Sequence, residues 1–183
     1  MPLTVEDLKR FQQQHPDYRL ELVDGAIIVM SPSGFESDEI AAEIVAQLRN
    51  WVRPRKLGRV TASSAGFKLP NREEDVRAPD ASFVKAERLK RTTEDYANLV
   101  PELIFEVRCK TDDLNQLRAK IRQFLDLGTT VGALVDYRTQ TIEVHRNQTD
   151  PTILHNGDRF TVPELLPGWE MEVSSIWPRS LIK

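Results

Sequence analysis

Three charged residues lie at positions that would suit metal binding or catalysis. Asp80 follows Pro79 at the start of a predicted short strand, and Glu106 interrupts an apolar run at 103–109. Lys120 lies in a predicted helix, at the border of its apolar stripe. Two carboxylates can hold Mg²⁺, the metal polarises a phosphate and acidifies a water, and a lysine can orient that water or stabilise developing charge. The order Pro-Asp, buried Glu and helix Lys therefore favours metal-dependent phosphodiester cleavage.

Each of these residues also has an ordinary structural interpretation. Asp80 could accept a backbone N–H in a turn, as aspartates often do. Glu106 could face solvent on an edge strand or pair with Arg108 or Arg118, because a buried carboxylate without a partner is costly. Lys120 could be a surface lysine whose stem covers apolar side chains. Each of these interpretations is open for the residue taken alone.

The elements that must position these residues follow from hydrophobic periodicity and turn signals. Three helices are predicted, at 5–14, 36–52 and 112–127, the last capped by Thr111. Segment 85–99 reads as irregular with room for a short helix. Strands are predicted at 18–23, 26–30, 59–63, 66–69, 80–84, 103–109, 131–136, 141–145 and 171–173. The strand–helix–strand order at 103–136 predicts a crossover unit in a mixed sheet, so the fold class is α/β or mixed α+β.

Length and composition set wide limits. The 183 residues suit a single domain over 1–183, with one cysteine and a net charge of −3. One cysteine excludes an intrachain disulfide and a cysteine-based zinc site. No apolar run reaches the length of a membrane span and no signal peptide is apparent, so the cytoplasm is the expected location. The negative charge argues against non-specific coating of nucleic acid.

The chain resembles the Uma2 family, a restriction-endonuclease-like family of the PD-(D/E)XK nuclease superfamily that is common in cyanobacteria. The resemblance spans roughly residues 4–178 and depends on the order and spacing of several short motifs. These motifs lie at 20–25 (LELVDG), 30–34 (MSPSG), 77–84 (RAPDASFV), 101–107 (PELIFEV), 120–128, 134–136 with the strand at 141–146, and 167–169 (PGW).

The resemblance implies a mixed β-sheet flanked by helices, with the site at one end of the central strands. Asp80 matches the first acid of the superfamily and Glu106 the second, so both are expected to bind Mg²⁺ or Mn²⁺. The superfamily lysine normally lies two residues after the second acid, where this chain has Arg108. The family moves the lysine to the following helix, and Lys120 matches that place.

A further acid often completes such sites. Glu36, Glu39 and Glu43 all lie on the predicted 36–52 helix. Glu36 and Glu43 border its apolar stripe, and we select Glu43 as the fourth catalytic residue. Glu21, in the first hairpin, is the alternative.

The chain departs from the family pattern at two places. Ser37 stands where many relatives have a histidine, and Cys109-Lys110 replaces a Ser-Pro pair. Lys110 lies four residues after Glu106 and would share its strand face if the strand continued, so it competes with Lys120 for the lysine role.

The resulting prediction is a Mg²⁺-dependent endonuclease that hydrolyses DNA, acting as a homodimer because cleavage of both strands commonly uses paired sites. The alternative is a weakly active or inactive nuclease-fold module that binds nucleic acid or a protein partner. A hydrolase with another substrate is a third possibility, since fold does not fix function. No aromatic set for stacking single strands is evident.

Overall fold

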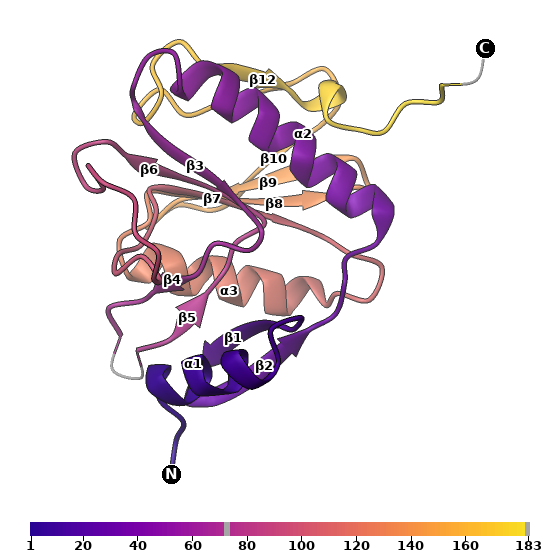
Figure 1. The fold of residues 1–183 in the computed structure, drawn as a ribbon. Helices are drawn as coiled ribbons and strands as arrows, with labels where there is room; N and C mark the ends of the chain where they lie inside the picture. Colours follow the sequence, from indigo (N-terminus) through magenta and orange to yellow (C-terminus); the bar gives the residue numbers. More distant parts are fainter. Residues whose placement is uncertain (72–73, 182–183) are drawn as a thin grey trace.

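The computed structural model describes residues 1–71 and 74–181 (Figure 1). The helices are α1 (Val5–Gln14), α2 (Phe35–Val52), α3 (Leu114–Asp126) and a short 3-10 helix at Val173–Ser175. The strands are β1 (Arg19–Val23), β2 (Ala26–Met30), β3 (Gly58–Ala62), β4 (Phe67–Lys68), β5 (Val76–Arg77), β6 (Ala81–Lys85), β7 (Leu103–Val107), β8 (Val131–Asp136), β9 (Thr141–His145), β10 (Thr152–Leu154), β11 (Arg159–Thr161) and β12 (Glu170–Glu172). Within the described ranges, no helix is long and apolar enough to cross a membrane.

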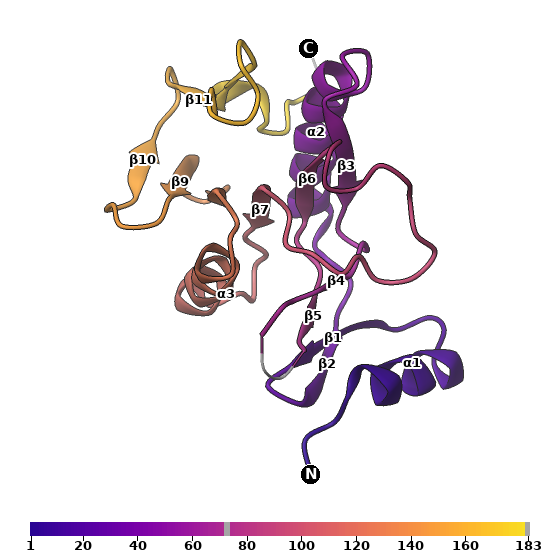
Figure 2. The same ribbon diagram turned by 90° about the vertical axis from the view of Figure 1, so that its left-hand side faces the viewer.

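The largest sheet is mixed and has helices on both faces. Its strand order is β10-β9-β8-β7-β6-β3, and β7 and β8 are parallel while the other neighbours are antiparallel. Helix α3 connects β7 to β8 and covers one face, and α2 covers the other (Figures 1 and 2). This arrangement confirms the predicted crossover unit and the mixed sheet flanked by helices.

Strand β7 is buried along its whole length and alternates between the two faces. Leu103, Phe105 and Val107 belong to the apolar cluster beneath α2, whereas Ile104 belongs to the cluster beneath α3. Glu106 therefore lies on the α3 face of the central strand, where an α3 side chain can reach it.

Helix α3 lies close against the sheet because a glycine faces it. A Cβ atom on Gly132 of β8 would lie 2.5 Å from Cγ2 of Ile121, so a larger residue would push the helix away. The helix begins two residues later than predicted: its cap is Asp113, whose side chain accepts the N–H of Asn115, rather than Thr111. The close packing at Ile121 brings the neighbouring Lys120 down onto the sheet.

A smaller antiparallel sheet packs against α1. Its order is β2-β1-β5-β4, and its first hairpin turns at Asp24 and Gly25, both with the positive φ of a two-residue hairpin turn. On β1, Leu20 and Leu22 join the apolar cluster that includes α1. Strand alternation therefore turns Arg19 and Glu21 to the opposite face.

Some predicted pairings are wrong. The strands predicted at 59–63 and 66–69 do not form a pair, because β3 joins the large sheet beside β6 and β4 joins the small sheet beside β5. Segment 85–99 contains no helix and instead forms turns with one bridge between Ala97 and Phe67. The short strands β5, β10 and β11 carried no sequence signal that we recognised.

Candidate active site

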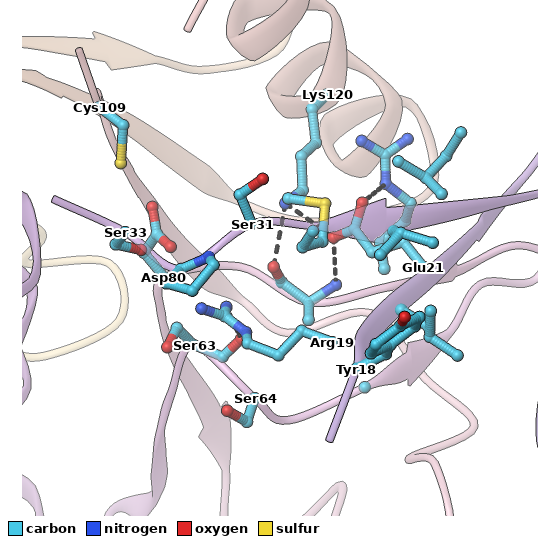
Figure 3. Close-up of a pocket in the computed structure, with 18 of the residues that line it drawn as sticks. Tyr18, Arg19, Glu21, Ser31, Ser33, Ser63, Ser64, Asp80, Cys109 and Lys120 are labelled. Carbon is cyan, nitrogen blue, oxygen red and sulfur yellow. Dashed lines mark hydrogen bonds and ion pairs between the residues drawn. The ribbon is translucent and has the colours of Figure 1, made fainter. Parts of the chain in front are cut away.

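A cavity of about 710 Å³ opens where the small sheet meets the large sheet and α3. Its wall takes side chains from β1 and β2, from the segment entering β6, from the end of β7 and from the first turns of α3 (Figure 3). Glu21, Asp80, Glu106 and Lys120 all line it. The structure thus brings together three of the four residues selected from the sequence, along with the alternative acid Glu21.

Lys120 is the centre of this group. Its Nζ lies 3.0 Å from Oε1 of Glu106 and 3.0 Å from Oε1 of Glu21, and it donates to the carbonyl oxygen of Ala78 at 2.9 Å. Only 7% of the residue is exposed. Lys120 is therefore a buried cation with two carboxylate partners, and the interpretation as an ordinary surface lysine is wrong.

Glu106 is paired with Lys120 rather than with the arginines considered from the sequence. Arg108 binds Asp136 at 2.7 Å, and Arg118 binds Glu143. The Glu106 side chain is almost fully buried, with 2% of the residue exposed. A solvent-facing edge position is therefore excluded.

Asp80 is held at the junction of β6 and β7. Its backbone N–H donates to the carbonyl of Phe105 at 3.0 Å, and its Oδ2 accepts the N–H of Val107 at 2.7 Å. The expected backbone contact of an aspartate in a turn is present, and the same contact fixes the carboxylate in the cavity wall beside Glu106. The side chain remains partly exposed.

Glu21 supplies the third carboxylate of the cavity, from β1 of the small sheet. Its Oε2 lies 3.0 Å from Nε of Arg77, and its Oε1 accepts the N–H of Ala78 at 2.8 Å (Figure 3). Arg77 in turn donates to Gln123 of α3. Sequence reasoning assigned Arg77 no role, although it stands in the same short motif as Asp80. The small sheet is thereby tied to α3 and to the segment that carries Asp80.

The candidates that compete with these residues lie elsewhere. Glu36, Glu39 and Glu43 are exposed on α2, and none of them is among the described residues that line the cavity. Glu43 instead accepts a hydrogen bond from Gln47 one turn along the helix. Lys110 is also exposed and outside the cavity wall, because β7 ends at Val107 and the chain turns away before Lys110.

The charges of the cavity are strongly coupled. Burial raises the pKa of Glu106 to about 8, with Asp80 and Glu21 adding to the effect and Lys120 opposing it. Burial also raises the pKa of Asp80, although Lys120 offsets part of the shift. Burial acts in the same direction on Glu21, but Lys120 and Arg77 outweigh it and hold the pKa of Glu21 below its usual value. Burial would lower the pKa of Lys120, yet Glu106 and Glu21 raise it above its usual value.

The two places where the chain departs from the family pattern are neighbours in space. Oγ of Ser37, at the start of α2, lies 3.1 Å from Sγ of Cys109 after β7. Cys109 also lines the cavity. The two positions at which the sequence analysis expects a departure from the family are therefore in contact, and one of them lies in the cavity wall.

The donor set that could hold a metal ion is small. Within residues 1–71 and 74–181, no group of three or more His, Cys, Asp and Glu side chains is arranged to hold one. Oε1 of Glu106 is nevertheless buried without a hydrogen bond, its contact with Lys120 being an ion pair of unsuitable geometry. Mg²⁺ is usually held by one or two carboxylates together with water and substrate phosphate. Asp80 and Glu106 fit that requirement.

Comparison with known proteins identifies the family of this chain. A family model described as "Uma2: Putative restriction endonuclease" matches residues 5–174. The chain belongs to the Uma2 family. No curated protein matches the sequence. Among solved structures, a "putative nuclease belonging to DUF820" from Anabaena variabilis is similar with a TM-score of 0.82 at 19% identity, covering 96% of this chain and 97% of that chain. The predicted family is confirmed, and the fold of this Uma2 chain is that of a nuclease structure.

Proposed function

We propose that this chain is a metal-dependent nuclease that hydrolyses DNA phosphodiester bonds at the cavity between its two sheets. The observation that carries the proposal is the convergence of Asp80, Glu106 and Lys120 in one cavity, although they come from three different elements. The membership of the Uma2 family supports the same reaction class. We also propose that the protein is located in the cytoplasm and acts as a homodimer.

Asp80 and Glu106 would hold a Mg²⁺ or Mn²⁺ ion. A bound ion would polarise the phosphodiester and lower the pKa of a water molecule. The protein contributes the placement of its own groups: Val107 fixes one oxygen of Asp80, and the sheet face fixes Glu106.

Lys120 provides positive charge beside the two acids. Its pKa is raised, so it stays protonated and can stabilise negative charge that develops on a phosphoryl oxygen. Glu21 and the Ala78 carbonyl hold the ammonium in place. We assign Glu21 as the fourth residue of the site, as a positioning residue, in place of Glu43.

The raised pKa of Glu106 predicts that metal affinity increases with pH. A carboxyl group binds a cation after losing its proton, and the pKa of Glu106 stands at about 8. Mn²⁺ affinity should rise roughly tenfold per pH unit below this value and level off above it. The free energy of unfolding of the metal-free protein should fall as the pH rises from 4.5 to about 8. Over this range Glu106 keeps a proton in the folded protein that it has lost in the unfolded chain, and this advantage of the folded state disappears as the pH approaches about 8. Calorimetric titration with Mn²⁺ on both sides of pH 8 measures the effect, and a pH-independent affinity would contradict it.

The direct test is nicking of supercoiled plasmid with and without Mg²⁺ or Mn²⁺. The native chain should convert plasmid to the open-circular form only with metal, and Glu106→Gln should remove this activity while keeping the shape of the side chain. Glu39→Gln is the matched control, because Glu39 is exposed on α2 away from the cavity. Equal nicking by Glu106→Gln and the native chain would contradict the proposal.

A second candidate function has one observation in its favour. Lys120 and Arg77 already balance the charges of Glu21 and Glu106, so these two acids need no metal ion for charge balance. A nuclease-fold module that only binds nucleic acid or a protein partner would have this property. Duplex binding in a mobility-shift assay that needs no metal and is followed by no cleavage would favour that function over hydrolysis.

A further inference from the structure

Exposed apolar side chains gather at the mouth of the cavity. Large apolar residues that stay in contact with water often mark a binding surface when they are contiguous. Four of them line this cavity, namely Tyr18, Ile28, Val29 and Met30, with exposed fractions of 47%, 43%, 53% and 37%. Phe35, which is 87% exposed, follows the wall residue Ser33 by two positions.

Tyr18 is the end of a column of aromatic rings. The rings of Phe11 and His15 have centroids 4.5 Å apart and are tilted by 40°, and those of His15 and Tyr18 are stacked at 5.0 Å and 15°. The column holds the Tyr18 ring in place at the cavity edge, where Figure 3 shows it on the side of the site near Arg19 and Glu21. A ring fixed in this way is a preformed stacking platform, and little conformational entropy is lost when a planar group stacks on it.

The outer strand β2 continues the apolar surface beside the acids. Its register places Ile28 opposite Glu21 and Met30 opposite Arg19. Cross-strand partners in an antiparallel pair share a face, so both apolar side chains flank the cavity face of β1. A molecule that reaches Glu21 and Lys120 from this side passes over them.

The cavity wall has little positive charge to offer to a duplex backbone. Among the residues that the structure describes, its cations are Arg19, Arg77 and Lys120. Arg77 and Lys120 bind the buried acids, and Arg19 donates to the carbonyl of Ser63 at 2.7 Å. Proteins that position a duplex do so mostly through phosphate contacts, whereas proteins that bind single strands also stack the bases on aromatic side chains, which a paired duplex does not offer.

We propose that the preferred substrate of this site is single-stranded or locally unpaired nucleic acid, with one unstacked base on Tyr18 and its neighbour against Ile28 and Met30. The proposal deepens the proposed function, because it relies on Asp80 and Glu106 for the reaction itself. A second copy of the chain could also cover an exposed apolar strand, but it would close the cavity that holds the reactive residues.

The test is binding of a fluorescein-labelled oligothymidylate and of a duplex of the same length, measured by anisotropy in EDTA so that no cleavage is required. The single strand should bind more tightly than the duplex. Tyr18→Ala should weaken single-strand binding roughly fivefold or more, the effect of losing one stacked base, whereas Tyr18→Phe should retain it. Ile153→Ala is the matched control, because Ile153 on β10 is 44% exposed and outside the cavity wall.

Met30→Ala tests the same surface with little risk to the fold, since this side chain lines the cavity on an outer strand and is 37% exposed. Equal binding of both oligonucleotides, or equal affinity of Tyr18→Ala, Met30→Ala and Ile153→Ala, would overturn the proposal. Sedimentation of a dimer that Val29→Asp dissociates would also overturn it and assign the surface to a second copy. Metal-dependent plasmid nicking is scored separately, so loss of the substrate preference and loss of the nuclease proposal give different results.

Discussion

Replacing Asp80 with asparagine should reduce Mn²⁺ affinity at least about 100-fold and abolish metal-dependent nicking. Loss of a residue that merely orients a metal ligand already costs 10–100-fold, and Asp80 would be a ligand itself. Titration calorimetry measures the affinity, and the plasmid assay measures the nicking. Glu43→Gln is the control, because it removes an exposed carboxylate of α2 that the sequence analysis had selected as the fourth catalytic residue.

The same substitution should leave the fold intact, which separates a functional loss from a structural one. The amide oxygen of asparagine can accept the N–H of Val107 as Oδ2 of Asp80 does. Burial raises the pKa of Asp80, so the charged carboxylate is unfavourable in the folded protein and a neutral amide should not lower the unfolding temperature. Unchanged Mn²⁺ affinity in a folded Asp80→Asn variant would refute the assignment of Asp80 as a ligand.

The parts of the fold that the sequence predicted are those controlled by local signals. The α1 helix, the Asp24-Gly25 hairpin and the α2 helix each depend on a few neighbouring residues. The crossover at 103–136 was predictable because a buried strand, an amphipathic helix and a second apolar strand follow one another. The two-residue strand β5 and its pairing with β4 were not predictable, because they are decided by the packing of the small sheet against α1.

The residues of the site also fall into those that local sequence signals reveal and those that depend on tertiary packing. Asp80, Glu106 and Lys120 could be selected because a charged residue among apolar neighbours can be recognised in the sequence. The sequence analysis selected Glu43 over Glu21 without such a signal, because both acids sit beside apolar residues in regular elements. The choice depends on how the β1–β2 hairpin docks against α3, through Arg77 and Gln123, and this contact joins segments far apart in the chain.

The stacking column illustrates a different limit. Phe11 and His15 are one helical turn apart, but Tyr18 follows Pro16 and belongs to the next segment. The stacking of its ring on His15 is a tertiary result of how the chain leaves α1. Composition alone, with three tyrosines and seven phenylalanines, gave no indication of it.

Lys120→Met should lower the free energy of unfolding by about 3 kcal/mol at neutral pH, at the lower end of the cost of breaking a buried ion pair. The ammonium has three partners, and its loss leaves Glu106, Glu21 and the Ala78 carbonyl without their shared donor. Two features limit the loss of stability. Glu21 keeps Arg77, and Glu106, whose pKa is about 8, already carries a proton in most molecules at neutral pH, so that little uncompensated charge is left behind. Urea denaturation followed by circular dichroism measures the change.

Lys110→Met is the control, with an expected change within about 0.5 kcal/mol, because Lys110 is exposed. The double variant Lys120→Met with Glu106→Gln should recover part of the stability, since a neutral amide needs no cation. The deficit of Lys120→Met should also grow as the pH rises through about 8, because Glu106 then loses its proton and its negative charge gains from the ammonium. A deficit that is equal well below and well above this pH would show that the ammonium of Lys120 has no electrostatic effect on Glu106.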